Sequence, residues 1–269
     1  AAISAVSLVD SINILVVQAF FALASGGTVV CSHHLGCEKK ERATNAARQL
    51  VFITFAMSLV IAIACHLFSD QLLGVIFGQV EPAVMDNAKK YFFFSAMSYP
   101  FIALYDDGAC ILRAQENSKL PMQISFVANG INVALNLIFV WVLHLGVAGS
   151  SAATMIARAF AMVAVLYKLR NPKMKIQLRD YFSIRPEWEE IKRILHIGVP
   201  SGIENGMFQF GKLAIQSTVS LMGTAAIAAQ GMTNIIENLS GIMSIGMGIG
   251  LMTVVGECLG AGEKEEAVY

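Results

Sequence analysis

Seven apolar runs, each long enough to cross a bilayer as a helix, constrain this chain more than any other feature. A spanning helix needs about 20 apolar residues, and runs of that kind occupy residues 5–31, 48–70, 90–113, 121–144, 147–168, 194–222 and 226–256. Because the runs are unbroken and do not alternate over about ten residues, they predict helices rather than barrel strands. Only 14% of the residues are charged, against about a quarter in an ordinary soluble domain. We therefore expect an all-α, polytopic membrane protein with seven transmembrane helices.

The sequence at the beginning of the chain is repeated near its end. Residues 225–267 match residues 1–43 at about a dozen positions, Gly36 and Gly260 among them, at a constant offset of 224. One structural unit therefore occurs twice, and the six crossings between its copies make the copies parallel, as in transporters built from two parallel bundles. By the same arithmetic we expect one more helix upstream and four downstream, so that the chain is a fragment. The last run also has glycines that would admit a close neighbour, at positions 241, 246, 248 and 250.

Lysine and arginine residues are concentrated on one side of the predicted membrane. They lie at 39–48, at 113–119 and throughout 168–193, whereas the connections on the other side contain only Lys89 and Lys90. Basic residues in short connections favour the cytoplasm, so the basic side is predicted to be cytoplasmic. We expect three parts: helices of a first lobe at 1–170, a cytoplasmic linker ending in an amphipathic interfacial helix at 171–193, and the first two helices of a second lobe at 194–269.

Four stretches resemble the multidrug and toxic compound extrusion (MATE) transporters, and together they extend over essentially the whole chain. They are LASGGTVVCSHHLGCEKKERA, NVALNLIFVWVLHLGVAGSSAAT, GVPSGIENGMFQFGKL followed by GTAAIAAQ, and GMGIG through GECLGAGEKEEA. The resemblance implies twelve helices in two pseudo-symmetric lobes, of which this chain would hold the second to the eighth. It also implies cation-driven export of organic, often cationic, compounds by alternating access in a bacterial-type plasma membrane.

Asn132 and Asn136 are the first candidates for a cation-coupling site. They are four residues apart and therefore share one helix face. Two buried amides there would coordinate a cation, or they would only form hydrogen bonds between helices. Many MATE members have Asn and Asp at these places, with the Asp in a proton or sodium site that an Asp of the first helix completes. An amide does not take up a proton near neutral pH, which puts proton coupling through Asn136 in question.

Asp107 is a second coupling candidate, because an ionisable group within a membrane span is costly unless it is paired or neutral. It follows Asp106 directly, and two neighbouring carboxylates repel one another when both are ionised. One possibility is that the pair exchanges a proton. The alternative, which we favour, is a pair wetted by a cleft open to the cytoplasm and neutralised by Arg113 or Arg158.

Glu204 and Lys212 are the remaining coupling candidates. Glu204 follows Pro200 by about one turn, and its alternative role is a wetted residue paired with Lys192 or Arg193. Lys212 lies two turns further along the same run, where it would be the counter-charge of a carboxylate or would disfavour cationic substrates.

Four residues are candidates for the lining of a substrate cavity: Glu237, Asn238, Asn205 and Phe208. Glu237 and Asn238 are polar residues in the middle of the last run, where they either line a cavity or tie helices together. Phe208 stands where some MATE members have a cation-binding glutamate, so that role is not carried over to Glu204.

Several classes of function are not expected. No hydrolytic or redox constellation occurs, so we predict no enzyme and no cofactor other than a coupling ion, H⁺ or Na⁺. His33 and His34 are adjacent rather than four apart, which disfavours a metal site, and a net charge of +0 disfavours a nucleic-acid partner. The hypothesis is a monomeric antiporter for small organic molecules in the bilayer. The alternatives are a lipid-linked saccharide flippase, which a cationic groove at Lys212 would favour, and a seven-helix receptor or sensor.

Overall fold

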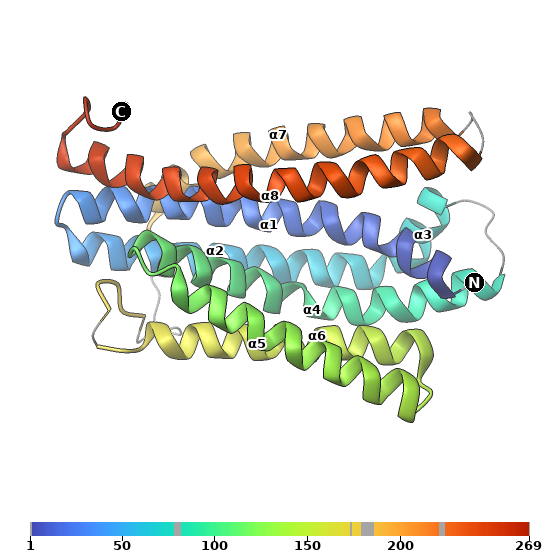
Figure 1. Ribbon diagram of the computed structural model, residues 1–269. Coiled ribbons are helices and arrows are strands. Elements are labelled where there is room, and N and C mark those ends of the chain that lie inside the picture. The colour runs from blue at the N-terminus through green and yellow to red at the C-terminus, as the bar shows by residue number, and fades with distance from the viewer. Residues whose placement is uncertain (1, 78–81, 173, 179–185, 221–223, 269) are drawn as a thin grey trace.

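The chain folds into long helices that run side by side (Figure 1). The computed structural model describes residues 2–77, 82–172, 174–178, 186–220 and 224–268, and some side chains within the helices, such as that of Asn238, lie outside this description. The described residues contain helices and no strand, which confirms the all-α class. In chain order the helices are α1 (Ala2–Gly36), α2 (Lys40–Leu67), α3 (Ser69–Phe77), α4 (Pro82–Ala114), α5 (Lys119–Asn136), the π-helix η1 (Leu137–Val142), α6 (Gly146–Leu169), α7 (Trp188–Ser220) and α8 (Thr224–Ala261).

Five stretches of these helices are long and apolar enough, by length and composition, to cross a membrane. They are Ile12–Gly36, Lys40–Leu67, Lys119–Val142, Gly146–Leu169 and Leu239–Ala261. The two other predicted spans lie in α4 and α7, which have 33 residues each. At 1.5 Å per residue each is about 50 Å long, more than the roughly 30 Å of a hydrocarbon core. Their apolar stretches are interrupted by charge, at Asp106 and Asp107 in α4 and at Glu204 and Lys212 in α7.

Helix α1 lies at the centre of the bundle and packs against α2, α4, α7 and α8. Figure 1 shows α7 and α8 along one side of α1, with α5 and α6 on the opposite side of the bundle. Two apolar clusters hold the first six helices together. One includes Leu23, Leu50 and Leu112, and the other includes Phe20 and Tyr99. Helices α1 to α6 therefore form one packed unit, against which the α7–α8 hairpin rests through α1.

The linker between α6 and α7 packs against the first lobe where the structure describes it. Ile176 and Leu178 are fully buried, and the backbone N–H of Ile176 donates to Gln115 Oε1 at 3.0 Å. Helix α7 begins at Trp188, so the described part of the predicted amphipathic helix forms the first turns of α7 rather than a separate element. Residues 179–185 of that prediction lie outside the described residues.

The two copies of the repeat, α1 and α8, run parallel and meet at their last turns (Figure 1). A Cβ atom on Gly36 would collide with the backbone oxygen of Glu257, and a Cβ atom on Gly260 would collide with the backbone oxygen of His33. Adding the repeat offset of 224 to Gly36 and His33 gives Gly260 and Glu257, so the same contact is made twice. Reciprocal contacts of this kind are the mark of a two-fold axis.

The position of that axis follows from one more contact. A Cβ atom on Gly256 would collide with Oγ of Ser32, the residue at the equivalent position of the first copy. A residue that meets its own equivalent lies at the axis, so a local pseudo-two-fold axis passes between Ser32 and Gly256. Within the described part of the chain, no atom lies within 4 Å of a Cβ built at glycine 241, 246, 248 or 250, so the expectation that these glycines admit a close neighbour stays a prediction.

Candidate functional sites

Asn132 and Asn136 lie together at the end of α5, and Thr154 of α6 completes the group. Asn136 Nδ2 donates to Asn132 Oδ1 at 3.0 Å, and Asn132 Nδ2 donates to Thr154 Oγ1 at 3.2 Å. The helical spacing of four residues predicted that the two amides would meet. Thr154 was missed, because nothing in the sequence indicates which face of α6 packs against α5. All three side chains are half-buried and neutral, so they supply oxygen atoms but no charge.

A cavity of about 340 Å³ opens beside this group, between α4, α5 and α6. Asn129, Asn132 and Thr154 contribute polar atoms to its lining, and Arg158 contributes the one charged group. The guanidinium of Arg158 donates to Ser98 Oγ at 2.7 Å, which holds it against α4. No lining residue of this cavity is a carboxylate, so its field disfavours a bare cation.

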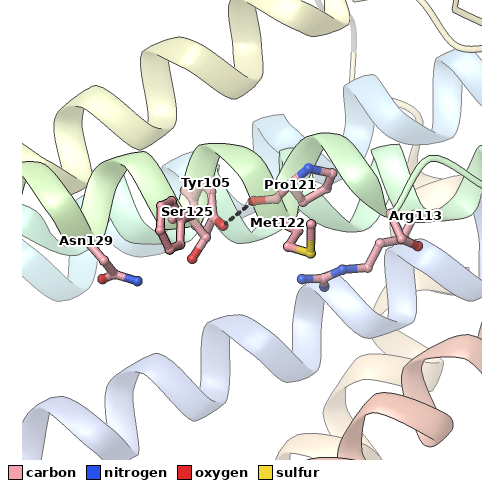
Figure 2. A pocket seen from close by; sticks show the side chains of 8 residues that line it. Tyr105, Arg113, Pro121, Met122, Ser125 and Asn129 are labelled. Atoms are coloured by element: carbon pink, nitrogen blue, oxygen red, sulfur yellow. Dashed lines mark hydrogen bonds between the residues drawn. The ribbon is translucent and has the colours of Figure 1, made fainter.

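A second cavity, of about 430 Å³, adjoins the first and shares Tyr105, Ser125 and Asn129 with it. Figure 2 shows Ser125 and Asn129 of α5 beside Tyr105 of α4, with Arg113 at the other end of the cavity. The hydroxyl of Tyr105 donates to the carbonyl oxygen of Pro121 at 3.5 Å. The lining of this cavity also contains one arginine and no acid. The two cavities together form a polar space, lined by two arginines, within the first lobe.

Asp107 lies inside the first lobe, not in a wetted cleft. Its side chain is completely buried, and neither carboxylate oxygen has a hydrogen-bond partner among the residues that the structure describes. Thr54 of α2 acts electrostatically on Asp107, and its buried Oγ1 likewise has no hydrogen-bond partner among the described residues. Asp106 is half-buried and is the member of the pair that lies within electrostatic reach of Arg113 and Arg158. The interpretation that we favoured is therefore wrong for Asp107, because it is packed on the side of α4 that faces α2.

A hydrogen-bonded network between α1 and α4 was not predicted. Asn13 is only 6% exposed, and its Oδ1 accepts from the Tyr99 hydroxyl at 2.8 Å while its Nδ2 donates to Ser95 Oγ at 3.3 Å. Asp10 Oδ1 accepts from the Tyr91 hydroxyl at 3.0 Å. Tyr91, Ser95 and Tyr99 recur at intervals of four, a spacing that does predict one polar face on α4.

Lys212 and Glu237 form an ion pair between α7 and α8. The distance from Lys212 Nζ to Glu237 Oε1 is 3.0 Å, and Nζ lies 5.0 Å from the centre of the Phe208 ring. Sequence reasoning had assigned Lys212 to ion coupling and the two others to a substrate cavity. The structure brings all three residues together.

The remaining candidates are not brought into a group. Glu204 is exposed on α7, and Arg193, its expected partner, instead pairs with Glu190 at 3.5 Å. Asn205 is half-buried on the same helix. Asn238 lies in α8, but its side chain is outside the described residues.

The parallel repeat, the apolar spans and the polar groups inside the bundle define a polytopic helical membrane protein built as a transporter. The MatE family model matches residues 1–138 and 200–268. The chain belongs to that family of multidrug transporters, and it is a multi-pass protein of the plasma membrane. The predictions of a MATE transporter and of a protein that is not an enzyme are thereby confirmed.

Curated relatives and solved structures agree with this assignment. The chain is 26% identical to "Probable multidrug resistance protein NorM" of Thermotoga maritima over 99% of this chain and 58% of that protein. It is 23% identical to "Multidrug export protein MepA" of Staphylococcus haemolyticus, over 94% of this chain and 55% of that protein. A solved structure, "Crystal structure of MATE in complex with MaL6", superposes with a TM-score of 0.93 at 20% identity, over 99% of this chain and 59% of that one. At this identity the last comparison shows the fold alone. The chain therefore spans somewhat more than half the length of these relatives.

Proposed function

We propose that the chain works within a secondary-active antiporter that exports organic, often cationic, compounds in exchange for H⁺ or Na⁺. The contact between α1 and α8 is the observation that carries the proposal. Equivalent helices of two lobes meet at one end about a pseudo-two-fold axis between Ser32 and Gly256. Lobes related in this way expose the space between them alternately on the two sides of the membrane as they rock. The multidrug names of the relatives support the compound class.

Coupling requires that each ligand bind the two states of the lobes with different affinity. The groups available for this role are Asn132 with Asn136 and Thr154, the buried Asp107, the exposed Glu204, and the Lys212–Glu237 pair. We propose no cofactor beyond the coupling ion, and we propose that the transporter works as a monomer.

A lipid-linked saccharide flippase is the second candidate, and the arginines favour it. Arg113 and Arg158 line the two first-lobe cavities without an accompanying acid, which suits the phosphate of a lipid-linked sugar. Lys212 does not add to this argument, because Glu237 neutralises it. Membership in a transporter family argues against the seven-helix receptor.

Transport by the purified full-length protein in liposomes tests the proposal. We expect a permanently cationic dye to move against its gradient when a proton or a sodium gradient is imposed, and to stop when that gradient is collapsed. If neither gradient moves the dye and a fluorescent lipid-linked sugar crosses the bilayer instead, the flippase replaces the exporter.

A further inference from the structure

The Lys212–Glu237 ion pair lies deep along α7 and α8. At a rise of 1.5 Å per residue, Glu237 is about 20 Å along α8 from Thr224, and Lys212 is about 12 Å before the end of α7 at Ser220. Both residues lie inside the apolar runs expected to span the membrane, 194–222 and 226–256, although the span that length and composition give within the described part of α8 begins two residues later, at Leu239. Ionised side chains at that depth need a partner. Here each supplies the partner of the other, at 3.0 Å.

The repeat shows which way Glu237 faces. Its equivalent in the first copy is Asn13, which is 6% exposed and bonds to α4 in the interior of the first lobe. Because a two-fold axis between Ser32 and Gly256 relates α1 to α8, the equivalent position on α8 faces the interior of the second lobe. Glu237 therefore does not face lipid.

The surroundings of Glu237 have the chemistry of an organic-cation site. A carboxylate combined with an aromatic face is the arrangement that recognises ammonium and other organic cations. Here the face belongs to Phe208, whose ring centre is 5.0 Å from Lys212 Nζ. The side chains of Lys212 and Glu237 are 39% and 50% exposed within this chain, on the side that faces the rest of the second lobe. Lys212 itself occupies the place that a bound cation would take.

The first lobe offers no comparable place. Its two cavities are lined by Arg113 and Arg158 and by no acid, and Asp107 is completely buried beside Thr54. Glu237 is paired with a cation, Lys212, that also lies over an aromatic ring.

We propose that Glu237 and Phe208 bind the positively charged group of an organic substrate, and that Lys212 is a tethered cation that fills this site when the substrate is absent. The inference rests on the proposed export of organic cations and places their binding group in the second lobe. Entry of the substrate releases Lys212, and departure of the substrate lets it return. No bond is made or broken; two cations exchange at one carboxylate. The filled and empty states then differ in charge pairing between α7 and α8, which is the difference in affinity that coupling requires.

Equilibrium binding of tetraphenylphosphonium to the full-length protein in detergent tests the inference, because this probe keeps its charge at every pH. We expect Glu237→Gln to weaken binding at least tenfold, because the variant loses the binding carboxylate. We expect Lys212→Gln to strengthen binding severalfold, because it loses the internal competitor. The double variant follows Glu237→Gln. The exposed pair Lys89–Asp70, at 2.8 Å, is the matched control, and Lys89→Gln and Asp70→Asn should leave binding within twofold.

The opposite signs separate a binding role from a structural one. A pair that only holds α7 to α8 predicts that both single variants weaken binding equally, and that result overturns the inference. Unchanged binding in Glu237→Gln overturns it as well, as does an unaltered protein that does not bind the probe. Phe208→Leu is a second variant that touches neither charge, and severalfold weaker binding is expected from it; thermal unfolding identifies any variant that fails to fold. If the unaltered protein binds the probe but transports it under neither gradient, the proposed function fails while this site stands.

Discussion

Helices α1 and α8 have similar sequences. Their last turns make the same contacts, but their equivalent polar residues nearer the other end do not. Where they cross, Gly36 and Gly260 make the same contact with the opposite helix, so the geometry of the repeat is kept. At the equivalent polar position they diverge. Asn13 is buried and bonded to Asp10, Ser95 and Tyr99, whereas Glu237 has an ion pair with Lys212 and is half-exposed within this chain.

This difference suggests different roles: Asn13 stabilises the packing of the first lobe, whereas Glu237 can exchange its partner. A satisfied, buried network is costly to open, because each donor or acceptor that loses its partner bears the full desolvation penalty. An accessible ion pair loses little when another cation replaces one member. The first lobe is thus built as a rigid unit around α1, while the α7–α8 hairpin has the group that responds to a ligand.

The largest effect on stability is expected when α1 receives the glutamate that α8 has at the equivalent position. Asn13→Glu places a carboxylate beside Asp10 in a site that is 6% exposed, while the guanidinium of Arg158 is bonded to Ser98. An uncompensated buried charge costs about 3–5 kcal/mol, so we expect a clear drop in the midpoint of thermal unfolding in detergent. The reverse change, Glu237→Asn, leaves Lys212 without its partner but adds no buried charge, so it should lower the midpoint less. Equal losses in the two variants would mean that α8 is fastened in the same way as α1.

The contact between the helices provides the next prediction. Gly36→Ala and Gly260→Ala each introduce a Cβ atom that collides with a backbone oxygen, of Glu257 and His33 respectively. Overpacking of this kind costs about 1–3 kcal/mol, and the pseudo-symmetry requires similar losses from both variants. Gly250→Ala is the control, because no atom lies within 4 Å of its Cβ and the helix gains propensity. Chemical unfolding of the purified full-length protein measures all three. A large loss at one glycine only would contradict the two-fold relation.

Sequence alone predicted the helices and the repeat, because both depend on patterns along the chain. The apolar runs fixed seven long helices, and the offset of 224 predicted that α1 and α8 are parallel. The spacing of Asn132 and Asn136 predicted that these two amides would meet. The contact of Asn132 with Thr154 depends on how α5 packs against α6, which the sequence does not show. The burial of Asp107 likewise depends on which side of α4 faces α2, and no local pattern encodes that choice.

The smallest effect on stability, but a clear one on coupling, is expected from Asn136→Asp. The amide of Asn136 bonds only to Asn132 and is half-buried, so the substitution should cost less than about 1 kcal/mol. It would place a carboxylate beside the 340 Å³ cavity, whose lining has an arginine and no acid. If the first lobe takes part in coupling, a new anionic group there changes the pH or Na⁺ dependence of dye export in liposomes. Asn117→Asp, in the loop before α5, is the control and should change neither. If export by Asn136→Asp keeps the dependence of the unaltered protein, the first-lobe amides are structural, and coupling falls to α7 and α8, where Glu237 lies.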